Sequence, residues 1–211
     1  MVDKSVSDKI AAGSIVANST VSDDVQPGGP VLSEREVLAD LCGRLIRDVP
    51  DYPEPGVVFK DITPLLVNGP AFAAVIKHFA DVARAAGGID LVAGMEARGF
   101  IMGAPVATAL GVGFVPVRKA GKLPGVTMEA SYDLEYGSAT VELLPDTIAP
   151  GSRVLIVDDV LATGGTAAAT ASLIEQAGGV VVGLAFLLEL LFLPGRSRLA
   201  GRSVDVILPV D

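Results

Sequence analysis

Short apolar runs alternate with segments of helical periodicity along most of the chain. Hydrophobic residues repeat at helical spacing after residues 33–36, which have the form of a capping box, and again after Pro70 as far as Gly87. From residue 88 onward the pattern predicts four strands and two helices, with strands at 90–94, 112–117, 153–157 and 180–188 and helices near 99–110 and 164–177. Such alternation is typical of βαβ units. It predicts an α/β fold with a parallel twisted sheet flanked by helices.

Two stretches lack this periodicity. Residues 1–31 are rich in Ser, Asp and Gly and end in Pro-Gly-Gly-Pro, so we expect a disordered leader followed by a single domain over 32–211. Residues 118–139 gather Gly, Pro, Lys, Tyr and Ser inside that domain. A long irregular stretch in this position is typical of a functional loop, and we expect it to be flexible.

Composition narrows the classes of function. Half of the 211 residues are hydrophobic and only 5% are aromatic, which favours a core of Val, Leu, Ile and Ala. The net charge of -9 argues against nucleic acid or an anionic membrane surface as a partner. The charge-free run 99–117 is broken by Gly and Pro, so it predicts a helix and a strand and not a membrane span. We therefore expect a cytoplasmic protein.

Single Cys and His residues limit redox and metal chemistry. Cys42 is the only cysteine, which allows no intrachain disulfide, and we expect a buried thiol in a reducing compartment. His78 is the only histidine and falls off the apolar stripe of its helix. This placement favours a solvated surface residue over a metal ligand or a base.

The segment 154–166 carries the most informative pattern. An apolar strand is followed by Asp158 and Asp159, which places both acids at the carboxyl end of a parallel strand, where ligands bind in such folds. The following turn can offer backbone N–H groups and hydroxyls to a phosphate at a helix N-terminus; its residues are Ala162, Thr163, Gly164, Gly165 and Thr166. The GxxxxGK[ST] and GxGxxG patterns are absent. Acids just before a phosphate turn suit a ribose 5-phosphate, because the two carboxylates would accept hydrogen bonds from its hydroxyls.

This segment resembles the motif by which type I phosphoribosyltransferases bind phosphoribosyl pyrophosphate (PRPP). Three further parts of the chain resemble the adenine-specific members of that family: DYPEPGVVFKDITP at 51–64, EARGF at 96–100, and RKAGKLPG at 118–125 with SYDLEYG at 131–137. The likeness covers roughly residues 34–200. It implies the type I phosphoribosyltransferase fold with a small N-terminal hood at about 50–66, and a homodimer.

The resemblance also implies what the hood does. Val58, Phe59 and Lys60 would bind adenine, with Phe59 stacking on the ring and the backbone near Val58 reading the base edge. From the sequence alone, a core position is the favoured explanation of Phe59. Many family members carry Arg at the position of Lys60, and Lys lacks the planar fork of Arg.

Other residues gain roles at the diphosphate and the transferred proton. The resemblance places six residues against pyrophosphate: Glu96, Ala97, Arg98, Arg118, Lys119 and Lys122. Cations clustered in an acidic chain favour an anionic ligand, although a solvated face remains the alternative. Arg98 and Glu135 would be catalytic, with Glu135 contacting the purine as general acid or base, unless it is an exposed loop residue. Mg²⁺ would arrive with PRPP and not in a protein cage.

We therefore expect an enzyme of purine salvage that converts adenine and PRPP to AMP and pyrophosphate. A transferase for xanthine, guanine or orotate is a second hypothesis, which the hood segment disfavours. A third is a PRPP-sensing regulator that performs no transfer. Such a regulator would need a DNA-binding module, and the first 31 residues are too short and too acidic to form one.

Overall fold

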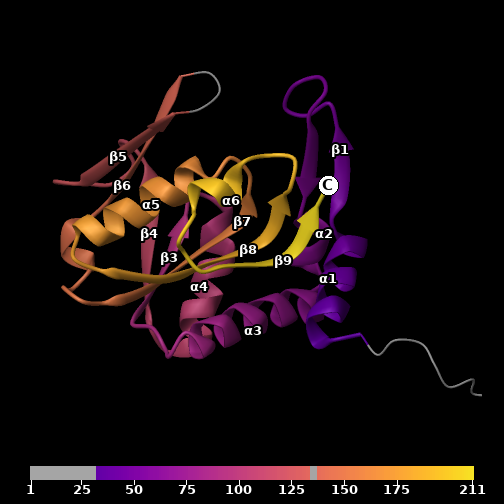
Figure 1. The fold of residues 1–211 in the computed structure, drawn as a ribbon, viewed down its shortest axis with the longest axis horizontal. Coiled ribbons are helices and arrows are strands. Elements are labelled where there is room, and N and C mark those ends of the chain that lie inside the picture. The colour runs from indigo at the N-terminus through magenta and orange to yellow at the C-terminus, as the bar shows by residue number, and fades with distance from the viewer. Residues whose placement is uncertain (1–31, 134–136) are drawn as a thin grey trace, which may run out of the picture. The chain divides into compact units, whose positions relative to one another are not determined.

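The computed structural model describes residues 32–133 and 137–211, and their fold is organised around a seven-stranded sheet (Figure 1). In spatial order the strands are β5 (Met128–Asp133), β6 (Ser138–Leu143), β4 (Gly113–Lys119), β3 (Leu91–Met95), β7 (Arg153–Leu161), β8 (Val180–Leu190) and β9 (Val204–Val210). The five strands from β4 to β9 are parallel, whereas β6 and β5 run antiparallel at one edge. The predicted α/β class is confirmed, and the sheet is mixed at that edge.

Helices cover both faces of the sheet because successive strand residues point to opposite sides. Val92 and Leu155 pack in one core with α1 (Glu34–Leu45), α3 (Gly69–Ala85) and α4 (Arg98–Leu110). Ala93 and Ile156, the next residues along the same strands, pack in a second core with α5 (Gly165–Gln176). The buried strands of the centre are therefore apolar on both faces, as the composition suggested.

Helix starts follow the local sequence. The capping box predicted before α1 is present, since Ser33 Oγ accepts from the Glu36 N–H at 3.3 Å and Glu36 Oε2 accepts from the Ser33 N–H at 2.7 Å. The Asn68 side chain accepts from the Ala71 N–H at the start of α3. These caps satisfy N–H groups that have no partner within the helix.

The N-terminal part of the described chain forms a small two-stranded ribbon. Strands β1 (Arg47–Pro50) and β2 (Val58–Asp61) pair antiparallel, and the short helix α2 (Thr63–Val67) follows them. In Figure 1 this ribbon stands beside the end of β8, on the same side of the sheet as the β5–β6 hairpin. The ribbon occupies the place where the sequence predicted a hood, with its first strand starting at Arg47.

Several predicted boundaries need correction. The stretch 118–139 is not irregular throughout, because β5 and the start of β6 form a hairpin within it. Strand β7 continues to Leu161, so Asp158 and Asp159 lie inside the strand. The strand is longer than predicted because β7 stays paired with β8 as far as Leu161. Pattern analysis also missed the 3₁₀ turn at Pro145–Thr147, helix α6 (Gly195–Arg198) and strand β9.

The lone histidine is not the solvated residue that we predicted. Its side chain is 19% exposed, and its Nε2 lies 2.8 Å from Asp205 Oδ2 on β9. Arg35 donates to the other oxygen of Asp205 at 3.0 Å, so α1 and α3 are both tied to β9. The periodicity of one helix cannot reveal a partner from a distant strand. Cys42 is fully buried as expected, and burial raises the pKa of its thiol to about 11.

Two negative findings hold for the described residues. Over 32–133 and 137–211, no helix combines the length and apolar character needed to cross a bilayer. Within the same ranges, no three His, Cys, Asp or Glu side chains gather in a way that would hold a metal ion. The predicted leader at 1–31 lies outside the described residues.

Candidate active site

The predicted phosphate turn lies between the end of β7 and the start of α5. Gly164 caps the helix with φ of 77°, a left-handed conformation that favours glycine. A Cβ on Gly164 would lie 2.5 Å from the carbonyl oxygen of Gly195, so a second backbone segment packs directly on the turn. A small cavity of about 70 Å³ opens at this point, lined by Met95, Asp158, Val160, Leu161, Ala162, Thr163, Gly164, Thr166, Ala167 and Phe186.

A tyrosine from the sheet edge covers the first turn of α5. A Cβ on Gly165 would lie 2.7 Å from Cδ2 of Tyr132, which leaves no room for a larger residue beneath the ring. The Thr166 hydroxyl donates to the Tyr132 oxygen at 2.8 Å. The structure thus places Tyr132, from the stretch predicted to be a functional loop, against the turn itself.

The paired acids form the electrostatic centre of the site. Asp159 is 3% exposed, and its Oδ2 lies 2.7 Å from Arg98 Nε without the alignment of a hydrogen bond, so this oxygen keeps an unused acceptor position. Burial, and then the neighbouring charge of Asp159, raise the pKa of Asp158 well above its usual value. Burial also raises the pKa of Asp159, while the charge of Arg98 opposes that rise.

Arg98 connects the acids to the hood. It is the first residue of α4 and follows the Glu96–Ala97 peptide bond, which is cis. Its guanidinium carbon lies 5.0 Å from the ring centroid of Phe59, while its Nε pairs with Asp159. A Cβ on Gly99 would lie 2.8 Å from the carbonyl oxygen of Val157, so the start of α4 fits closely against β7. Arg98 is therefore held where β3, β7 and the hood meet.

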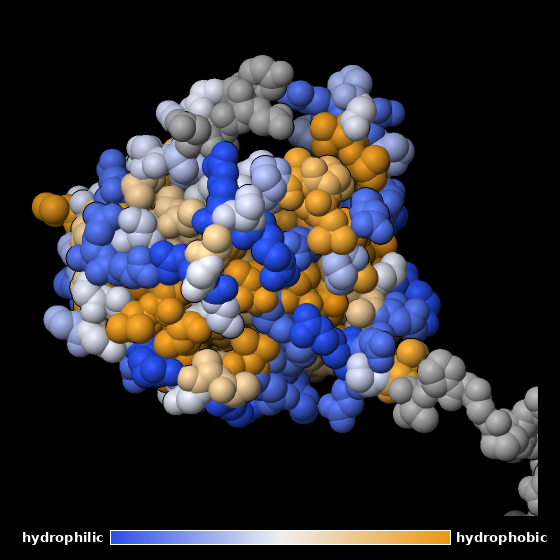
Figure 2. All heavy atoms as spheres, viewed as in Figure 1, coloured by the Kyte–Doolittle hydropathy of each residue, from blue (hydrophilic) through white to orange (hydrophobic). Residues whose placement is uncertain are grey.

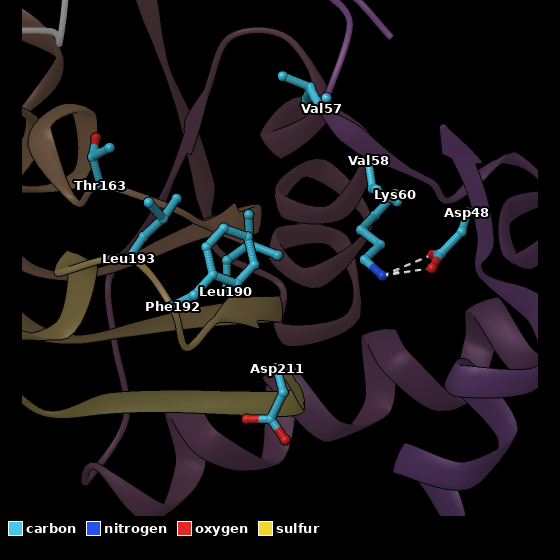
Figure 3. Close-up of a pocket in the computed structure, with 10 residues that line it drawn as sticks. Asp48, Val57, Val58, Lys60, Thr163, Leu190, Phe192, Leu193 and Asp211 are labelled. Carbon is cyan, nitrogen blue, oxygen red and sulfur yellow. Dashed lines mark hydrogen bonds and ion pairs between the residues drawn. The ribbon is translucent and has the colours of Figure 1, made fainter. Parts of the chain in front are cut away.

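A larger cavity of about 710 Å³ lies between the hood and the loop after β8 (Figure 3). Val57 and Val58 line it from the hood. Facing them are Leu190 at the end of β8, and Phe192 and Leu193 in the β8–α6 loop. Thr163 lines both this cavity and the phosphate turn, so the two are contiguous. Figure 2 shows hydrophobic side chains gathered on this face, between the β8–α6 loop and the β1–β2 ribbon.

Lys60 and Phe59 contribute to the hood in different ways. Lys60 lines the cavity, and its ammonium donates to both oxygens of Asp48 at 2.8 and 2.9 Å (Figure 3). Phe59 contacts Tyr52 edge-to-face, with ring centroids 5.3 Å apart, while Arg98 lies over its face. The Phe59 ring is thus held between the hood and the first turn of α4.

The other predicted cations cluster around a carboxylate. Glu96 accepts from Arg118 Nε at 3.3 Å and from the backbone N–H of Lys119 at 2.9 Å. The Lys119 N–H and then the Arg118 side chain lower the pKa of Glu96, which keeps it ionised. Glu96 therefore orients the start of the cationic segment, and an anion would meet Arg118, Lys119 and Lys122 in preference to Glu96 itself.

Sequence reasoning missed the wall formed by the β8–α6 loop. The apolar residues 191–193, which follow the end of a buried strand and precede Pro194-Gly195, were a usable signal, because such a loop is usually polar. Leu191 and Phe192 are 50% and 67% exposed, next to each other in this loop. Glu135, the predicted acid or base, lies outside the described residues.

Comparison with known proteins gives a consistent result. The family model described as "Phosphoribosyl transferase domain" matches residues 65–208. The adenine phosphoribosyltransferase of Thermobifida fusca is 63% identical over 173 residues, covering 82% of this chain and 98% of the relative. That of Frankia casuarinae is 59% identical over 175 residues, covering 83% and 93%. The Saccharomyces cerevisiae adenine phosphoribosyltransferase, solved with D-2,5-dideoxy-2,5-imino-altritol 1,6-bisphosphate and adenine, is similar with a TM-score of 0.78 and 42% identity, covering 82% and 99%.

Proposed function

The chain belongs to the phosphoribosyltransferase family, and from this premise we propose that its site joins adenine to the ribose of PRPP. The products are AMP and pyrophosphate, and the enzyme is a pentosyltransferase of purine salvage. The reaction forms a bond between a ring nitrogen of adenine and the anomeric carbon. It breaks the bond from that carbon to the diphosphate oxygen, which leaves with the electron pair.

One observation carries this proposal most directly. The apolar cavity under the hood and the small pocket at the phosphate turn share Thr163, so a flat base and a phosphorylated sugar can bind side by side. Asp158 lies in the wall of the smaller pocket, and the buried Asp159 follows it on the same strand. This arrangement suits two substrates that must meet in line, because positioning alone supplies a large part of the rate enhancement of a transfer.

The acids and cations divide the charge that develops during transfer. The sugar passes through an oxocarbenium-like state, as in other glycosyl transfers, and becomes positive while the diphosphate becomes more negative. Asp158 and Asp159 accept from the ribose hydroxyls close to the positive carbon, and the free acceptor position on Asp159 supports this role. Arg98, Arg118, Lys119 and Lys122 stabilise the departing pyrophosphate. Glu135 removes the proton that adenine loses.

The donor groups of the site fit a magnesium ion that arrives with PRPP. Mg²⁺ prefers one or two carboxylates together with substrate phosphates, and Asp158 and Asp159 supply that number of carboxylates next to the phosphate turn. When bound, the ion neutralises part of the diphosphate charge. Asp158 and Asp159 would help to hold it next to the phosphate turn.

Two further expectations belong to the same proposal. We expect a homodimer, as the family resemblance implies, and a single species with the mass of the monomer in sedimentation equilibrium would contradict it. We expect the enzyme to act in the cytoplasm, because a polyanion such as PRPP does not cross a bilayer unaided.

The ribose role of the acids can be tested by removing both charges. The double variant Asp158→Asn, Asp159→Asn should reduce kcat/KM by about 100-fold or more, because charge-assisted hydrogen bonds to the sugar are lost at the reacting centre. Formation of AMP, followed by chromatography, measures the change. Asp146→Asn is the matched control, since Asp146 is exposed in the 3₁₀ turn away from the site. Unchanged turnover in the double variant would exclude the ribose role.

A further inference from the structure

A buried glutamate lies under the segment that joins β4 to β5. Glu142 is on β6 and is 2% exposed, and its Oε1 accepts from the backbone N–H groups of both Lys122 and Leu123 at 2.7 Å. Gly121, just before them, has φ of 79°. Successive N–H groups next to a left-handed residue form a concave nest that binds anions. In this protein the anion in the nest is the side chain of Glu142.

The same segment reaches the other predicted pyrophosphate ligands. Arg118 donates to the carbonyl oxygen of Lys122 at 3.3 Å, and its other guanidinium nitrogens donate to Glu96. Glu96 and Glu142 therefore both contact the backbone of the segment that carries the three cations. Glu96 holds the end of β4 through Lys119, and Glu142 holds the turn at Lys122.

A negative charge at this place is unfavourable by simple electrostatics. Glu142 lies next to the segment that is proposed to bind pyrophosphate, so its charge opposes the binding of an anion there. A buried carboxylate is also costly to desolvate unless several donors compensate it. A neutral residue in its place would avoid both costs. The contacts of Glu142 with the backbone indicate what the charge contributes, which is the geometry of the turn.

We propose that Glu142 is a positioning residue for pyrophosphate, which acts by holding the backbone at 121–123 so that Lys122 and Arg118 meet the leaving group. This inference rests on the proposed function, since it concerns the pyrophosphate half of the same site. Burial alone would raise the pKa of Glu142, but N–H groups of Leu123, Lys122 and Gly121 and the Thr127 hydroxyl outweigh it and leave the pKa lowered. The carboxylate thus stays ionised at neutral pH.

Glu142→Gln separates this role from a direct charge effect, because the two predict changes of opposite sign. Loss of a nearby negative charge alone would strengthen the binding of magnesium pyrophosphate. Loss of the charge-assisted bonds loosens the turn. We therefore expect the affinity for magnesium pyrophosphate to fall by about 10-fold or more, while the affinity for ribose 5-phosphate stays almost unchanged. Titration calorimetry with both probes measures this. Glu129→Gln is the control, since Glu129 pairs with Glu142 across the hairpin but is exposed.

Steady-state kinetics provide a second readout that a general loss of stability would not give. The KM for PRPP should rise in Glu142→Gln while the KM for adenine stays within about twofold of the unchanged enzyme, because the base cavity is lined by other elements. Equal losses for pyrophosphate and ribose 5-phosphate, or stronger pyrophosphate binding, would overturn the proposal.

A glycine variant keeps the test valid if Glu142→Gln does not fold. Gly121→Ala strains the nest from the solvent side, where a Cβ meets nothing within 4 Å, and it should weaken pyrophosphate binding in the same direction. Gly125→Ala, with φ of 83° and equally open space, is its control outside the nest. If the unchanged enzyme neither forms AMP nor binds pyrophosphate, the proposed function fails. If the unchanged enzyme does both, but Gly121→Ala and Gly125→Ala have the same affinity for pyrophosphate, only the proposed role of the nest is wrong.

Discussion

At the scale of single residues, Asp158 and Asp159 place two carboxylates side by side where neither is well solvated. Such an arrangement disfavours the charged form of both, and the charge of Arg98 opposes the rise in pKa at each of them, more strongly at its direct partner, Asp159. A pair of this kind destabilises the folded protein at neutral pH. The proposed role accounts for the pair, since ribose hydroxyls need acceptors, and such a conflict between stability and activity is usual at a functional site.

This conflict predicts a variant that is more stable but inactive. Asp158→Asn keeps the oxygen that accepts from the Asp159 N–H and removes one of the two charges. The free energy of unfolding at pH 8 should rise by on the order of 1 kcal/mol, while kcat/KM falls strongly. Urea denaturation and an AMP assay on the same preparation measure both quantities.

The gain in stability should depend on pH in a defined direction. The pKa of Asp158 is raised in the folded state, so the folded protein binds this proton more tightly than the unfolded chain does. Its stability therefore falls as pH rises from about 3.9, the unfolded value, through the raised folded pKa. The advantage of Asp158→Asn should grow over that range and be small in acid. A variant that is less stable than the unchanged protein at every pH would contradict this account.

At the scale of elements, the wall formed by the β8–α6 loop and the phosphate turn are in direct contact through their backbones. Gly195 begins α6 just after the apolar loop, and a Cβ on it would overlap the carbonyl oxygen of Ala162 in the turn. The Glu189 carboxylate holds this corner from the other side, since Arg196 donates to both of its oxygens. The two substrate pockets are thus joined by rigid contacts and not by a flexible loop.

A methyl group at this contact should damage both pockets. Gly195→Ala should reduce turnover by about 100-fold and raise the KM for adenine and for PRPP together, because the turn and the loop must move apart. Gly43→Ala is the matched control: its Cβ would meet only Leu208 at 3.9 Å, and Ala in helix α1 should stabilise by about 0.5–1 kcal/mol. Initial-rate kinetics at varied adenine and PRPP decide the matter; an unchanged KM for either substrate in Gly195→Ala would show that the contact is not required.

The elements differ in how well the sequence predicts them. The helices α1, α3, α4 and α5 and the central strands carry strong periodicity, so local pattern was sufficient. Strand β5 was missed although Met128, Ala130 and Tyr132 alternate with polar residues, because Gly and Pro just before it indicated a loop. Strand β9 lies beyond the last element that we predicted. The extension of β7 depends on its pairing with β8, which no local pattern encodes.

At the scale of the whole described domain, the site is assembled from segments that are distant in sequence. The motif at 154–166 was sufficient to predict that the two acids and the glycine-rich turn lie together between a strand and a helix, because they are contiguous along the chain. The base cavity was not predictable in this way. Val57 and Leu193 face each other across it only after the sheet has brought the hood and the end of β8 together (Figure 3).

The arrangement also explains why the order of strands matters for function. Strands β3 and β7 are neighbours, so Arg98 after β3 meets Asp159 on β7, and β8 next to β7 delivers the apolar wall. The carboxyl ends of parallel strands gather at one edge of a sheet, which is where open α/β folds bind ligands. Under the proposed function, base, sugar and diphosphate would each be bound at the ends of neighbouring strands of one sheet.

The central claim is that this edge transfers a phosphoribosyl group to adenine. The most direct measurement is a base panel, in which adenine, guanine, hypoxanthine, xanthine and orotate are each offered with PRPP and Mg²⁺ and both products are quantified. We predict that adenine gives AMP and pyrophosphate in equal amounts, with a kcat/KM far above that of every other base. Faster turnover of another base, or PRPP binding without any nucleotide formed, would contradict it.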